Sequence, residues 1–200
     1  MRQWMAAVLL VVAGSFAAPA QAGEPERVVA DFHRAILSVM AEAGTLGPRG
    51  RYERLKAPLT QGFHLGEMAR IATGRAWATA GQPEREALVD AFAHMAIATY
   101  ANRFDDYSGQ SFETLGVEPG PSGSRLVQTR IVRPRKEPVR IDYLMTERDG
   151  RWGIHDILLA GGISQLATWR SEYAATLRSG GLPALTQALR RKGDQQLAAG

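Results

Sequence analysis

The sequence lacks cysteine entirely, which excludes disulfide bonds, cysteine nucleophiles and thiolate metal sites. A glycine-rich phosphate loop, a His-Glu-x-x-His pair and a Gly-x-Ser-x-Gly elbow are also missing. No two of the four histidines are spaced four residues apart, so the sequence predicts no metal site. These absences favour a binding protein without a cofactor over an enzyme.

Long hydrophobic runs and tracts of one charge are scarce after residue 23. Charged residues break every apolar stretch there within about seven residues, whereas a membrane-spanning helix needs roughly 20 apolar residues. The net charge is +4, of which Arg2 contributes one, and cations and anions are interspersed along the chain. This pattern predicts solvated faces and no nucleic-acid groove.

The N-terminus has the order of a secretory signal peptide. Arg2 supplies a positive charge, an apolar run extends from Met5 to Val12, and a small-x-small site follows at Ala20-Gln21-Ala22. The apolar run is too short for a membrane anchor. We therefore expect residues 1–22 to be a cleaved signal peptide and residues 23–200 to form a soluble, periplasmic domain.

The first half of this domain has helical periodicity. Apolar residues recur at spacings of three and four over residues 24–43, and shorter helices are expected over 50–59 and 63–72. The longest pattern begins at Pro83, a residue suited to a first helical turn, and extends to about Tyr107. Its wide apolar stripe predicts a helix that is buried on more than one face.

From Ser111 the pattern changes to period two. Strands are expected over residues 111–118, 125–133, 138–147 and 151–160, with turn residues such as Asp149-Gly150 between them. Two helices follow, from Ile163 to about Arg178 and from Leu182 to Lys192. The expected fold is therefore α+β, with a helical N-terminal part, a four-stranded mainly antiparallel sheet and two C-terminal helices.

Two stretches, residues 140–173 and 63–109, resemble the MlaC family of periplasmic phospholipid-binding proteins, also known as the toluene-tolerance auxiliary component of an ABC transport system. The elements that carry this resemblance are Tyr143-Leu144, Asp149-Gly150-x-Trp152, Ile154-x-Asp156-Ile157, Gly162-Ile163-Ser164, Arg170-Ser171-Glu172-Tyr173, and upstream Phe63, Met68, Ala72, Gly74, Trp77, Phe92 and Tyr100. Their order and spacing are more specific than any one of them.

Within that family the chain is most similar to the hopanoid-biosynthesis-associated HpnM group. The phrases that favour this group are Gly50-Arg51-Tyr52, Ala98-Thr99-Tyr100-Ala101-x-Arg103-Phe104 and Ala167-Thr168-x-Arg170-Ser171-Glu172-Tyr173. The resemblance implies a monomeric carrier that binds a phospholipid or a hopanoid, docks transiently on membrane-bound transport components and moves lipid between the inner and outer membranes.

The residues supply a physical reason for such a role, because an acyl chain needs an apolar container to cross water. The apolar face of the sheet and the broad helical stripe could enclose a dry cavity between them. The candidate lipid-binding residues are Met68, Ile71, Phe92, Met95, Tyr100, Phe104, Val127, Ile131, Ile141, Tyr143 and Met145. The same residues could equally pack into a filled core.

Two other functions stay open at the level of the sequence. The chain could be an adaptor that organises lipid-modifying enzymes without carrying lipid, in which case a filled core is expected. It could also be an isomerase-like enzyme that uses Asp142, His155 or Asp156 in an apolar pocket. Adjacent His155 and Asp156 point to opposite faces of a regular strand, so a structural role is expected for Asp156.

Overall fold

The computed structural model describes residues 24–199, and the signal peptide expected at residues 1–22 lies outside them. The elements are α1 (Glu24–Ala41), α2 (Ala43–Gly62), α3 (Leu65–Thr73), α4 (Arg75–Thr79), α5 (Gln82–Arg103), β1 (Ser111–Pro119), the 3-10 turn η1 (Pro121–Gly123), β2 (Arg125–Arg133), β3 (Lys136–Arg148), β4 (Arg151–Leu159), β5 (Ile163–Ser164) and α6 (Gln165–Ala198). No helix in this part of the chain combines the length and apolarity that a bilayer-spanning segment requires. The predicted α+β class is confirmed.

The sheet is an antiparallel meander in the order β1-β2-β3-β4-β5. It has five strands rather than the predicted four, because residues 163–164 pair with the end of β4 before the helix begins. Ala160, Gly161 and Gly162 all have positive φ, which reverses the chain so tightly that Ile163 lies opposite Leu159. The predicted helix at Ile163 therefore begins two residues later.

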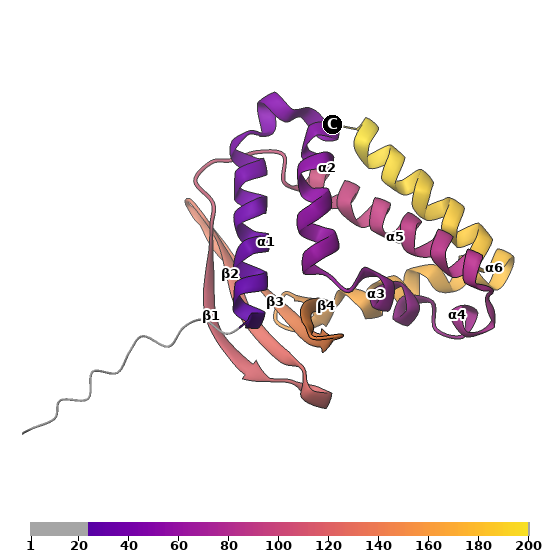
Figure 1. Cartoon of the computed structure of the whole chain (residues 1–200). Coiled ribbons are helices and arrows are strands. Elements are labelled where there is room, and N and C mark those ends of the chain that lie inside the picture. Colours follow the sequence, from indigo (N-terminus) through magenta and orange to yellow (C-terminus); the bar gives the residue numbers. More distant parts are fainter. Residues whose placement is uncertain (1–23, 200) are drawn as a thin grey trace, which may run out of the picture.

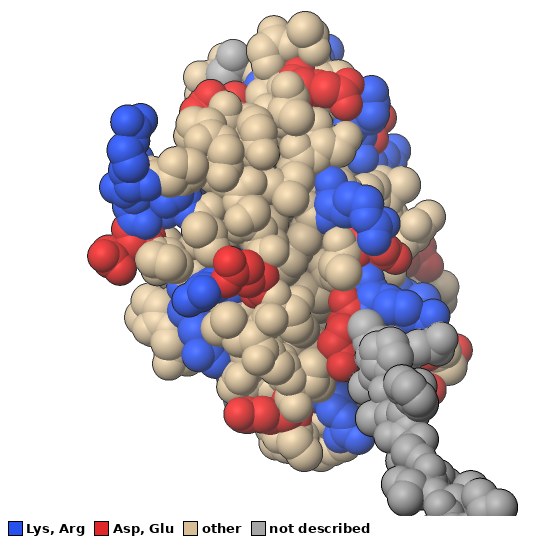
Figure 2. Space-filling model, turned by 90° about the vertical axis from the view of Figure 1, so that its left-hand side faces the viewer, with Lys and Arg blue, Asp and Glu red and all other residues tan. Residues whose placement is uncertain are grey.

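The sheet and the helices form two layers, with the sheet at the left and the helices mainly to its right in Figure 1. Helix α1 packs on the sheet, and α5 and α6 pack closely on each other. On the side of the molecule that faces left in Figure 1, basic and acidic side chains are interspersed (Figure 2). That side carries no large patch of only positive or only negative charge.

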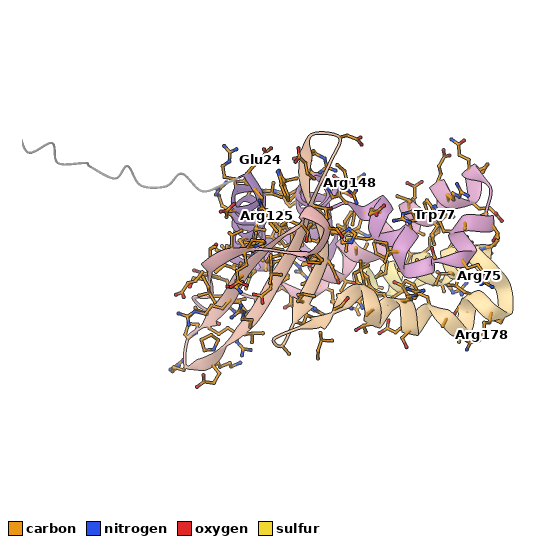
Figure 3. All side chains as sticks on the ribbon, turned by 90° about the horizontal axis from the view of Figure 1, so that it is seen from below. Glu24, Arg75, Trp77, Arg125, Arg148 and Arg178 are labelled. Carbon is orange, nitrogen blue, oxygen red and sulfur yellow. The ribbon has the colours of Figure 1, made fainter. Side chains whose placement is uncertain are left out.

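Helix α6 is bent sharply at Gly181, whose φ of 63° and ψ of −162° are outside the helical region. Only glycine adopts this conformation without strain, and Pro183 then restarts a helical turn. We call residues 165–180 the first arm and residues 182–198 the second arm. Figure 1 shows the second arm, in yellow, returning beside α5, and Figure 3 places Arg178 far from the sheet. The two predicted C-terminal helices correspond to these arms.

A buried arginine joins helices α2 and α5. Arg51 of α2 is 5% exposed and donates from Nε to the Ala101 carbonyl at 2.7 Å and from an Nη to the Ala43 carbonyl at 3.3 Å. The Ala101 carbonyl lies near the C-terminal end of α5, where the helix dipole favours a cation. Arg51 therefore fixes the end of α5 against the start of α2.

Candidate functional site

A cavity of about 290 Å³ lies between the inner face of the sheet and helices α1, α5 and α6. Its size is close to the lower end of the range for small-molecule sites. The apolar part of its wall consists of Phe32, Ile36, Met95, Ala96, Tyr100, Phe104, Phe112, Ile141, Tyr143, Ile157, Leu159 and Trp169. The polar part consists of Thr99, Arg103, Gln165, Glu172, Lys192 and Gln196. The cavity is therefore an apolar chamber with a polar margin.

Aromatic rings make up much of the chamber wall. Phe32 meets Tyr100 edge to face with ring centroids 5.4 Å apart, and Tyr100 stacks on Phe104 at 5.8 Å. Such geometries let the quadrupoles of the rings attract each other. The rings thus give the cavity a largely apolar lining, to which Tyr100 and Tyr143 add a hydroxyl group each.

One buried polar pair lies at the junction of α1 and the sheet. His33 Nε2 is 3.0 Å from the Tyr143 hydroxyl, and the His33 ring stacks on Phe112 at 3.9 Å. Burial lowers the pKa of His33 to about 4, so the imidazole is neutral at neutral pH. Desolvation also raises the pKa of Tyr100 and Tyr143, which keeps both phenols protonated. The apolar part of the chamber wall is thus uncharged.

Charged residues at the margin come from three helical segments. Arg103 is in the last turn of α5, Glu172 is on the first arm of α6, and Lys192 is on its second arm. All three residues are exposed, whereas the apolar residues of the chamber wall are buried or half-buried. They surround the point where the cavity meets solvent, which we call the mouth.

Asp156 attaches the first arm of α6 to the sheet. Its carboxylate accepts hydrogen bonds from the backbone N–H of Ile157 at 2.8 Å, from the backbone N–H of Leu166 at 3.0 Å, and from the Ser164 hydroxyl. Ser164 in turn caps the helix by accepting from Ala167 N–H at 3.0 Å. The structural role predicted for Asp156 is confirmed, and this network positions the part of α6 that borders the cavity.

The structure brings together five of the eleven candidate lipid-binding residues in the cavity wall. These five are Met95, Tyr100, Phe104, Ile141 and Tyr143. The other six, Met68, Ile71, Phe92, Val127, Ile131 and Met145, do not line it and belong to or pack around the filled core. The two interpretations of the apolar stripe therefore apply to different residues.

Ile157 and Leu159 are wall residues that the sequence reasoning missed. Counting back from the Asp149-Gly150 turn places Tyr143 opposite Asp156, but the structure pairs Tyr143 with Ile157. The difference is a bulge at His155, which lies between the Leu144–Asp156 and Met145–Ile154 pairs. Phe32 and Ile36, also missed, could have been found from their four-residue spacing on one face of α1.

The three candidates for acid-base chemistry lie outside the cavity wall. Asp142 accepts from Thr129 N–H at 3.1 Å and from Arg140 at 2.9 Å, and Asp156 holds α6 as described. Burial lowers the pKa of His155, and this side chain does not line the cavity either. The residues proposed for an isomerase-like site are therefore not assembled around the chamber.

The family model described as MlaC protein matches residues 30–191 of this chain. The chain belongs to the MlaC family. A solved structure of similar fold is a phospholipid-binding protein from Ralstonia solanacearum in complex with a phospholipid, with a TM-score of 0.75 and 18% sequence identity. The match covers 88% of this chain and 99% of that protein. At this identity, the likeness shows that the two proteins share a fold.

Proposed function

We propose that this MlaC-family chain is a periplasmic carrier that binds the apolar part of a phospholipid or hopanoid and shuttles it between inner- and outer-membrane components. The observation that carries the proposal is the chamber of about 290 Å³ with an uncharged, largely aromatic wall and a polar mouth. Family membership and the phospholipid bound to the Ralstonia protein support the same ligand class. The chain would dock transiently on membrane-bound transport components, as a monomer.

The wall supplies the driving force for such binding. Burial of an acyl chain is favourable by about 0.8 kcal/mol for each CH₂ group. Side chains such as Met95 adapt to a flexible guest, because an unbranched thioether changes rotamer at little cost. The polar head group would stay at the mouth, where Arg103 and Lys192 can contact it without being buried.

Two observations favour a carrier over the alternatives. The chamber itself argues against an adaptor with a filled core. Its ionisable side chains are two protonated tyrosines in the wall and exposed charges at the mouth, which leaves no buried acid-base pair facing a guest. A binding role without chemical turnover accounts for this arrangement.

The decisive experiment compares lipid content after filling the chamber. Ala96 lines the cavity, so Ala96→Phe would place a ring where the acyl chain lies, whereas Ala57→Phe makes the same change on the exposed face of α2. Native mass spectrometry and lipid extraction of detergent-free mature protein should find stoichiometric lipid in wild type and Ala57→Phe. Ala96→Phe should retain at most about a tenth of it, as expected for steric exclusion.

Wild-type protein that is empty, and that takes up neither phospholipid nor hopanoid, would contradict the carrier and favour the adaptor. Equal lipid in Ala96→Phe and Ala57→Phe would place the lipid somewhere other than this cavity. The extracted lipid itself would identify the cargo as a phospholipid or a hopanoid.

A further inference from the structure

The mouth of the cavity carries both signs of charge. Arg103 and Lys192 are cationic, Glu172 is anionic, and all three residues line the cavity. Within residues 24–199, none of them takes part in an ion pair. Their charges are therefore available to a ligand rather than neutralised by one another.

The fold has to bend a helix to bring these charges together. Glu172 and Lys192 are 20 residues apart, which would separate them by about 30 Å along a straight helix. The turn at Gly181 returns the second arm toward the cavity, so both side chains border the same mouth. On the first arm, Gln165, Trp169 and Glu172 follow one helical face, and on the second arm Lys192 and Gln196 do so.

Neighbouring residues do not cancel this arrangement. Gln196 accepts a hydrogen bond from the Asn102 side chain at 2.6 Å, which ties the second arm to α5 beside Arg103. Asp194 is directed away from the mouth, toward His94 at 3.0 Å. Asp105 and Asp106 follow Arg103 in the chain but do not line the cavity.

We propose that the mouth is a head-group subsite for a zwitterionic phospholipid with a primary amine, such as a phosphoethanolamine lipid. Arg103 and Lys192 would bind the phosphate, because guanidinium and ammonium groups form charge-assisted hydrogen bonds to phosphate oxygens. Glu172 would accept a hydrogen bond from the head-group ammonium. This inference rests on the proposed carrier function and adds selectivity among head groups to it.

The chemistry distinguishes three head groups that share a phosphate. A phosphoglycerol lipid leaves Glu172 facing a group with no positive charge, and its net negative charge is repelled there. A phosphocholine lipid has a positive charge but no N–H to donate to the carboxylate. Only the phosphoethanolamine lipid satisfies both signs with hydrogen bonds.

The test is a competition among lipids with identical acyl chains. Delipidated protein is exposed to an equimolar mixture of dioleoyl phosphoethanolamine, phosphocholine and phosphoglycerol, and the bound lipid is quantified by native mass spectrometry. Wild type should favour phosphoethanolamine over phosphoglycerol by about 3- to 5-fold, the size expected for one solvent-exposed charge pair. Glu172→Gln should abolish that preference.

Matched controls separate a local effect from a change in net charge. Glu118→Gln removes a carboxylate from the exposed end of β1, and Lys56→Gln removes an ammonium from the exposed face of α2. Glu118→Gln should keep the wild-type preference. Lys192→Gln should weaken uptake of all three phosphate lipids together, whereas Lys56→Gln should not.

The outcomes distinguish this inference from the carrier proposal. Lipid bound without head-group preference, or equal behaviour of Glu172→Gln and Glu118→Gln, would overturn the head-group subsite and leave the carrier intact. Protein that binds none of the three lipids would overturn the phosphoethanolamine subsite. If it also took up no hopanoid, the carrier would be overturned as well.

Discussion

The inner face of the sheet has a filled half and a hollow half. Around Val127 and Met145 the face is covered completely, and both side chains are 0% exposed. Around Ile141 and Leu159 the same face borders the chamber, and these side chains are only half-buried. Residues of one chemical type thus stabilise the fold in one half and remain available to a ligand in the other.

Apolar character alone therefore does not separate core residues from binding-site residues. The helical residues Met68 and Phe92 belong to the same filled core as Val127 and Met145, and each is 1% exposed. In the hollow half, bent α6 borders the chamber with Trp169, whose ring meets Phe92 edge to face at 5.2 Å. What differs is whether other side chains cover the residue completely or the cavity borders it.

The largest expected effect is the loss of stability when one side chain in each half is truncated to alanine. Met145→Ala should lower the free energy of unfolding by about 2–5 kcal/mol, because it leaves a cavity in a filled region. Ile141→Ala should cost about 1 kcal/mol, since its side chain already borders empty space. Urea denaturation of both variants measures the difference. Equal losses would mean that the two halves are packed alike.

An intermediate effect concerns the junction between α1 and the hollow half. Because the pKa of His33 falls from 6.5 to about 4 on folding, the unfolded chain binds more protons between these values. The contribution of neutral His33 to the free energy of unfolding is therefore complete above pH 6.5. It is lost as the pH falls toward 4, and the loss amounts to at most about 3 kcal/mol.

Denaturant unfolding of wild type and His33→Phe from pH 7 to pH 4 measures this contribution. The variant should show a shallower dependence on pH, with a remainder from His64 and His155, whose pKa values burial also lowers. Parallel curves for the two proteins would rule out His33 as the titrating group.

The smallest expected effect concerns the bend at Gly181, which returns the second arm of α6 to the cavity. Gly181→Ala places a side chain at a φ of 63° and should cost about 1–3 kcal/mol in thermal stability. Gly44→Ala, whose new Cβ would meet nothing within 4 Å, should be neutral or slightly stabilising. If the two alanines behave alike, the bend is not held by backbone conformation.

Much of the fold could be predicted from the sequence because period and turn chemistry are local. The strand boundaries follow from alternation and from residues such as Asp149-Gly150, whose positive φ values form the expected hairpin turn. The two arms of α6 follow from Gly181 and Pro183. The fifth strand was missed because a two-residue pairing has no periodicity of its own.

The candidate site was less predictable because its residues depend on register and on packing distance. The bulge at His155 moves Ile157 and Leu159 into the wall, and a single strand gives no indication of which residue will bulge. The mouth residues Glu172 and Lys192 are polar and far apart in the chain, so a search for apolar stripes does not find them.

The hydrogen bonds made by Arg51 and by His33 would respond differently to acid in the periplasmic location proposed above. Arg51 donates to backbone carbonyl oxygens, which do not titrate. Acid near pH 4 would therefore weaken the contact of α1 with the sheet at His33 but leave the hydrogen bond from Arg51 to the end of α5 in place. Acid would thus weaken the packing of the chamber wall that α1 forms, whereas the wall that α5 forms, which carries Arg103, would stay in position.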